Sequence, residues 1–81
     1  MTNNYKAIIC SNIAYLRKVN GLSRTAMSKK LHITLKTLDL LEQGTFPHRT
    51  SFDIVYRIAD SFQVRVHDVM YTRLEETAVP N

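Results

Sequence analysis

The stretch from Gly21 to Gly44 constrains the fold more than any other part of this sequence, because it holds two short helical patterns between two glycines. Ser23 precedes the first pattern and Thr34 precedes the second, and hydroxyl side chains at such places cap helices by accepting from free N–H groups. A glycine just past a helix adopts the left-handed conformation that ends it. The stretch therefore predicts two short helices joined by about three residues, the arrangement of a helix-turn-helix unit.

The apolar residues of this stretch give each predicted helix one buried face. Helical spacing brings together Ala26, Met27 and Leu31 in the first helix, and Thr37, Leu38, Leu41 and Glu42 in the second. Between the helices, His32 is predicted to be a turn residue, because histidine tolerates a positive φ better than most residues do. We expect no metal site, since no two histidines of the chain have the spacing of metal ligands.

Two further helices are predicted at the ends of the domain. The first runs from about residue 4 to residue 19, ends at Gly21, and has a buried face formed by Ile9, Ile13 and Leu16. The last runs from about Val66 to Tyr71. Its start is expected to be weak, because Arg65 offers no capping oxygen.

One more helix is predicted after the loop of residues 45–50, in which Phe46 is expected to pack against the core. Thr50 or Ser51 is its predicted cap, and Asp53 lies in its first turn, where the helix dipole favours a negative charge. Its predicted buried residues are Phe52, Val55, Tyr56, Ile58, Ala59 and Phe62.

Taken together, these residues resemble the phage-repressor and Cro-type (XRE-like) helix-turn-helix family. The resemblance covers roughly residues 5–71 and rests on an ordered set of spacings: Asn12-Ile13, Tyr15-Leu16-Arg17-Lys18, Gly21-Leu22-Ser23, Leu31, Ile33-Thr34, Thr37-Leu38, Leu41-Glu42-Gln43-Gly44, Ser51-Phe52, Ile58-Ala59, Phe62, Val64 and Asp68-Val69. It implies an all-α fold, a compact five-helix lambda-repressor-like domain with the helix-turn-helix at its second and third helices. We place this domain at residues 5–72, between a frayed N-terminus at residues 1–4 and a flexible tail at residues 73–81. The resemblance also implies an ion pair between Arg17 and Glu42.

In this family the third helix enters the major groove, and its N-terminal residues meet base edges. The resemblance thus implies a transcriptional regulator, most simply a repressor, that reads double-stranded DNA with residues 34–43. The residues at the implied base-reading positions are Leu35, Lys36, Asp39 and Leu40. The expected phosphate contacts are Ser23, Arg24, Thr34, Thr37, His48, Arg49 and Thr50.

Two features leave the partner open. Leu35 and Leu40 are apolar where family members commonly carry polar side chains, so an alternative is a protein-binding member of the fold, such as an antirepressor or adaptor. A homodimer is expected for a DNA reader, because two-fold symmetry places two recognition helices one DNA turn apart. Its possible contacts are Met70, Tyr71 and Leu74, for which closing the protein's own core is the other possible role.

Composition narrows the class of protein. With 44% hydrophobic and 22% charged residues, the chain is typical of a folded globular domain and not of a disordered one. No apolar run approaches the length of about 18 residues that a membrane span needs. The net charge of +4 suits a nucleic-acid partner, although a solvated basic surface would have the same charge.

The remaining signals indicate an intracellular binding protein. The N-terminus lacks the apolar segment of a signal peptide, which predicts a cytoplasmic location. The single cysteine, Cys10, lies among isoleucines and is predicted to be a small buried residue and not a nucleophile. The chain has no phosphate-binding glycine loop, no Cys-x-x-Cys pair and no serine with an identifiable base, so neither an enzyme nor a cofactor is predicted.

Overall fold

The computed structural model describes residues 5–46 and 52–77, and these form six helices. They are α1 (Tyr5–Val19), α2 (Arg24–Leu31), α3 (Leu35–Glu42), α4 (Asp53–Phe62), α5 (Val66–Tyr71) and α6 (Leu74–Thr77). The all-helical prediction is confirmed, and the described part contains one helix more than the five predicted. The expectations for residues 1–4, for the capping residues Thr50 and Ser51, and for residues 78–81 lie outside the described residues.

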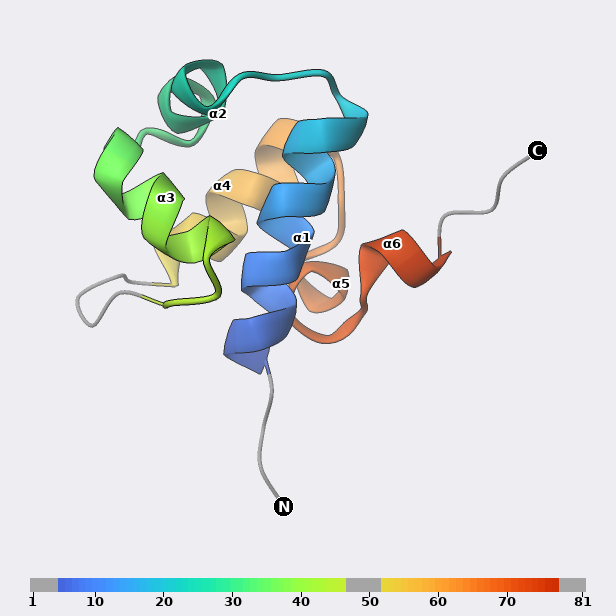
Figure 1. The fold of residues 1–81 in the computed structure, drawn as a ribbon. Helices are drawn as coiled ribbons and strands as arrows, with labels where there is room; N and C mark the ends of the chain where they lie inside the picture. The colour runs from blue at the N-terminus through green and yellow to red at the C-terminus, as the bar shows by residue number, and fades with distance from the viewer. Residues whose placement is uncertain (1–4, 47–51, 78–81) are drawn as a thin grey trace.

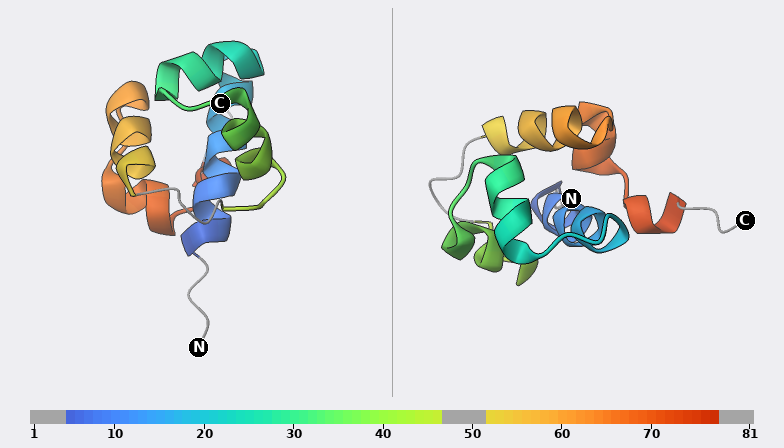
Figure 2. Two further views of the ribbon diagram at one scale, coloured as in Figure 1. Left: turned by 90° about the vertical axis from the view of Figure 1, so that its left-hand side faces the viewer. Right: turned by 90° about the horizontal axis from the view of Figure 1, so that it is seen from above.

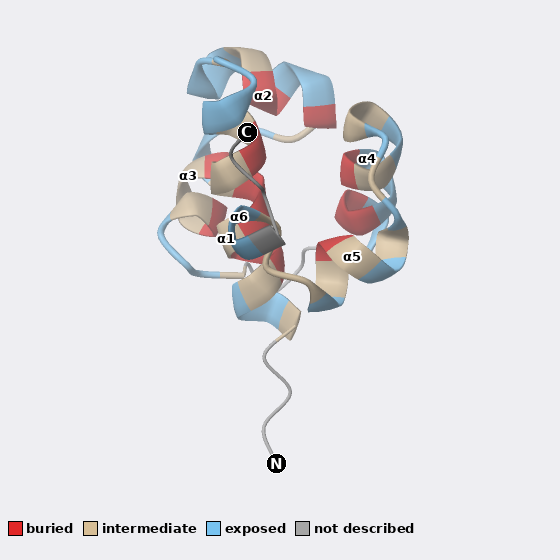
Figure 3. Ribbon diagram, turned by 90° about the vertical axis from the view of Figure 1, so that its right-hand side faces the viewer, coloured by how far each residue is buried: buried red, intermediate tan, exposed pale blue. Residues whose placement is uncertain are grey.

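Helix α1 is the centre of the fold. It contacts α3 on one side and α5 and α6 on the other, and α4 also reaches it (Figure 1). Seen from above, the other helices surround α1 (Figure 2). Their inner faces carry the buried residues, and their outer faces are exposed (Figure 3). The buried apolar residues are Ile9, Cys10, Ile13, Leu16, Met27, Leu31, Leu38, Leu41, Ile54, Val55, Ile58 and Val69.

Four helices end at a residue with a positive φ. Gly21 and Gly44 do so at φ 65° and 89°, as predicted, and His32 does so at φ 57°, which confirms it as a turn residue. Gln63, at the end of α4, also has a φ of 57°. After each of these residues the chain turns back, and its next N–H bonds a carbonyl of the last helical turn, as Ile33 N–H does with Ser28 at 3.0 Å.

The buried face of α4 differs from the prediction. Ile54, Val55 and Ile58 are buried, whereas Tyr56 is 62% exposed and Phe52 is 44% exposed. Tyr56 and Ile58 differ by two residues, which separates them by about 160° around a helix, so they cannot both face the core. Helical spacing alone allows either the face with Tyr56 or the face with Ile58 to be buried. The protein buries the face that carries the β-branched residues Ile54, Val55 and Ile58.

Asn12 joins α1 to the end of the chain. Its side chain is fully buried, and its Nδ2 donates to the carbonyls of Val69 and Thr72, both at 2.9 Å. Its Oδ1 accepts from the N–H of Leu74 at 3.0 Å. This amide therefore fixes the start of α6 against α1, in a region where the sequence predicted a flexible tail.

Candidate nucleic-acid interface

Helices α2 and α3 begin with the predicted caps. The Ser23 hydroxyl accepts from the N–H of Ala26 at 3.0 Å, and the Thr34 hydroxyl accepts from the N–H of Thr37 at 3.1 Å. The Thr34 hydroxyl also donates to the Thr37 hydroxyl at 2.9 Å. A hydroxyl that accepts a capping bond keeps its own O–H as a possible donor to an anion. In these bonds Ser23 and Thr37 therefore act only as acceptors and keep their own O–H, whereas the Thr34 O–H donates to Thr37.

The outer face of α3 carries the four implied base-reading residues. Leu38 and Leu41 are completely buried and define the inner face. Leu35 is 44% exposed and Lys36 is exposed, whereas Asp39 and Leu40 are half-buried. The N-terminal end of this face, formed by Leu35 and Lys36, is thus its most accessible part.

Arg17 and Glu42 form the ion pair implied by the resemblance. Arg17 donates to Glu42 through Nε and, at 3.0 Å, through Nη2, and its Nη1 donates to the Leu22 carbonyl at 3.0 Å. These bonds to Glu42 raise the pKa of Arg17 above its usual range. The pair ties the C-terminal end of α1 to α3 and so fixes α3 on the core.

Arg24 is not an isolated cation, as a free phosphate contact would be, because two carboxylates lie near it. Its Nε is 3.6 Å from Asp39 Oδ1 and 3.5 Å from Glu42 Oε1. It is the first residue of α2, and both carboxylates are on α3. The structure therefore brings one implied phosphate contact together with one implied base reader, which the sequence did not predict.

The turn between α2 and α3 has a further support that sequence reasoning missed. Arg57, on α4, donates to the carbonyls of Leu31 and His32 at 3.3 and 3.1 Å. A cation at the C-terminal end of a helix is favoured by the helix dipole. Because these residues are far apart in the chain, no local signal marked Arg57 as a capping residue.

The remaining site residues are placed as follows. His48, Arg49 and Thr50 lie outside the described residues. Cys10 is 4% exposed, and burial raises the pKa of its thiol, as fits a packing residue. Within residues 5–46 and 52–77, no cluster of three or more histidine, cysteine or acidic side chains is arranged to hold a metal ion.

The residues expected at a dimer contact divide into two kinds. Met70 and Leu74 are half-buried and pack against the protein's own core. Tyr71 is 49% exposed, and its ring lies 5.1 Å from that of His67. Of the three, Tyr71 is the residue with a large accessible apolar surface.

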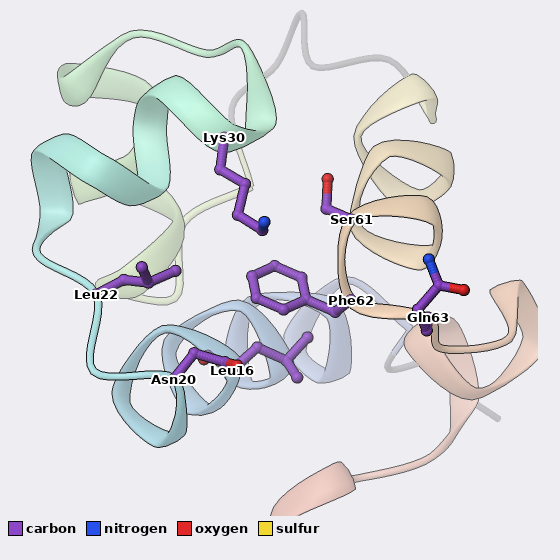
Figure 4. Close-up of a pocket in the computed structure, with 7 residues that line it drawn as sticks. All are labelled: Leu16, Asn20, Leu22, Lys30, Ser61, Phe62 and Gln63. Atoms are coloured by element: carbon purple, nitrogen blue, oxygen red, sulfur yellow. The ribbon is translucent and has the colours of Figure 1, made fainter.

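A shallow hollow of about 300 Å³ lies between the ends of α1, α2 and α4 (Figure 4). Lys30 reaches over the ring of Phe62, with its ammonium 5.4 Å from the ring centroid. The lining residues are Leu16, Asn20, Leu22, Lys30, Ser61, Phe62 and Gln63, which include no carboxylate and no histidine. The hollow thus offers a single cation above an aromatic ring, an interaction that holds α2 against α4.

Comparison with known proteins gives one match. A family model described as a Cro/C1-type HTH DNA-binding domain matches residues 12–74, which include all of α2 to α5. The searches of curated proteins and of solved structures found no match. None of the helices in the described ranges has the length and hydropathy needed to cross a membrane.

Proposed function

This chain belongs to the Cro/C1-type helix-turn-helix family of DNA-binding domains, and from that premise we propose that it is a repressor that reads operator DNA with α3. The observation that carries the proposal is the exposed N-terminal end of α3. Leu35 and Lys36 project there from a helix that Thr34 caps and that the Arg17–Glu42 pair holds on the core.

Base readout would come from α3. Lys36 can donate to guanine O6 and N7, and Leu35 can pack against a thymine methyl group. Asp39 can accept from a cytosine amino group, and half-buried Leu40 would contact the same groove at its edge.

Phosphate contacts would position the domain. Helix N-termini attract anions, and α2 begins at the Ser23 cap. The net charge of +4 adds a general attraction to DNA. His48, Arg49 and Thr50 would extend the clamp along the backbone.

Repression requires only that the operator be occupied, so a DNA-binding domain suffices for it. A homodimer would bind two half-sites with centres about 34 Å apart and gain affinity from both. The cytoplasmic location inferred from the sequence agrees with this role.

The proposal is tested by fluorescence anisotropy of a labelled generic duplex, titrated with the protein at several salt concentrations. We expect binding that weakens with salt, with a logarithmic slope of about 0.9 per phosphate contact. Operator selection from a random library then follows, and Lys36→Gln should relax the preference for guanine at one position of the selected site. Absence of binding at low salt would contradict the proposal.

The exposed Leu35 favours a second candidate, a protein-binding surface on the same face. Leu40→Gln separates the two. If α3 reads DNA, this variant changes sequence preference, whereas if the face binds protein, it leaves DNA affinity intact.

A further inference from the structure

We propose that Arg24 acts as a positioning residue that neutralises Asp39 on the reading face of α3, instead of being a direct phosphate contact. The inference rests on the proposed DNA-binding function and assigns Arg24 a role within it. It follows from the charged groups that line the groove between α1, α2 and α3.

This groove has a volume of about 320 Å³ and is lined by Ala14, Arg17, Lys18, Arg24, Asp39, Glu42 and Gln43. Arg17 and Glu42 are paired within it, with side chains only 15% and 7% exposed. Glu42 is thus satisfied by Arg17 without any help from α2. The charge that needs a partner is Asp39, whose side chain is 44% exposed on the outer face of α3.

Arg24 supplies that partner. Its Nε lies between the two carboxylates, at 3.6 Å from Asp39 Oδ1 and 3.5 Å from Glu42 Oε1. With two arginines and two carboxylates, the cluster of Arg17, Arg24, Asp39 and Glu42 has no net charge. Replacing Arg24 by a neutral residue leaves these four residues with one net negative charge, on the face of α3 that would approach DNA.

The two roles of Arg24 predict different energetics. If Arg24 contacts phosphate directly, Arg24→Gln lowers the affinity even when Asp39 has already been made neutral. In the positioning role, the Asp39 charge opposes DNA only when Arg24 is absent. Residues in contact show such non-additivity, whereas distant ones do not.

The experiment is a double-mutant cycle of Arg24→Gln and Asp39→Asn, read as affinity for a generic duplex so that base readout does not enter. In the wild type, Asp39→Asn should raise affinity by at most about threefold, and in the Arg24→Gln background by about tenfold or more. Asp60→Asn, a carboxylate on α4, serves as the matched control and should give the same small effect in both backgrounds. Circular dichroism verifies that each variant is folded.

Salt dependence gives a second reading that a merely structural role would not produce. Arg24→Gln/Asp39→Asn leaves the charge of the cluster unchanged, so its slope should equal that of the wild type. If Arg24 contacts phosphate, the slope of this double variant falls by about 0.9.

An additive cycle, or that fall in slope, overturns the inference while leaving the proposed function intact. If the wild-type protein shows no salt-dependent DNA binding, both the proposed function and the role of Arg24 are overturned. The anisotropy titration of the wild type reveals this case before any variant is made.

Discussion

At the residue scale, the left-handed positions at helix ends show how the chain ends its helices without long loops. Gly21 and Gly44 occupy two of them, and a Cβ added at either would have no atom within 4 Å. His32 and Gln63 occupy the other two, both at φ 57°. The free-energy cost of a side chain at these positions therefore comes from the left-handed backbone conformation and not from steric overlap with other residues.

Gly44→Ala and His32→Gly should change stability in opposite directions. The alanine variant should lower the free energy of unfolding by about 1 kcal/mol, the cost of a side chain in the left-handed region. The glycine variant removes that cost but loosens the unfolded chain, and should raise stability by about 0.5 kcal/mol. Urea unfolding measures both, and effects of the same sign would contradict this account.

Asp68 makes stability depend on pH. Hydrogen bonds from Arg65, at 3.0 Å, and from the Thr72 hydroxyl, at 3.0 Å, hold the pKa of its carboxyl below the usual range. A carboxyl whose pKa is lower in the folded state stabilises the protein above its unfolded pKa, and this contribution is lost as pH falls through the folded pKa.

We therefore expect Asp68→Asn to flatten the decline in stability below about pH 4, where unfolded aspartates become protonated. Thermal unfolding of both proteins at pH 2–7 tests this. Asp60→Asn is the control, and its profile should follow that of the wild type. Parallel profiles for Asp68→Asn and the wild type would be the opposing result.

At the scale of elements, Asn12 is the residue whose replacement should destabilise a segment far from it in the sequence, because its side chain bonds residues 69–74. Asn12→Ala removes the two N–H donors to the carbonyls of Val69 and Thr72 and the acceptor for the Leu74 N–H, in a region that is buried or partly buried. We expect a loss of about 3 kcal/mol in the free energy of unfolding.

Hydrogen exchange locates this effect. The amide of Leu74 should exchange faster in Asn12→Ala, because its hydrogen bond to the Asn12 side chain is lost, while the amides of α3 keep their relative protection. Ser11→Ala, its half-buried neighbour on α1, provides the control. Uniform acceleration in every helix would mean that Asn12 supports the whole core and not α6 in particular.

The sequence predicted the features that depend on residues close together in the chain, and it did not predict those that depend on contacts between distant residues. Ser23, Thr34 and Gly44 act within a few residues, so the bounds of α2 and α3 followed from their types. Position on a helical wheel depends on the neighbouring helices, which is why Tyr56 was wrongly predicted to be buried. The pairing of Arg24 with Asp39 and the attachment of α6 by Asn12 join residues distant in sequence, and no local pattern encodes them.

At the scale of the whole molecule, the described helices share a single small core. Met70 and Leu74 pack against that core and help to close it. Tyr71 and Tyr56 remain as exposed aromatic side chains on α5 and α4. A dimer contact near the C-terminal end of α5 would thus depend mainly on Tyr71.

Tyr71→Asp should therefore separate dimerisation from folding. The substitution places a charge on a side chain that is 49% exposed, so we expect the helical content and unfolding midpoint to stay near those of the wild type. It should shift the sedimentation coefficient from dimer to monomer and weaken binding to a palindromic operator by about tenfold or more, because a monomer loses the second half-site. Tyr56→Asp changes another exposed tyrosine, 62% accessible on α4, and should leave both measurements unchanged. A wild type that sediments as a monomer, or a Tyr71→Asp variant that binds the operator as tightly as the wild type, would exclude a dimer built on this end of α5. Leu74→Asp is a poorer test, because Leu74 packs against the core and its loss would combine unfolding with dissociation.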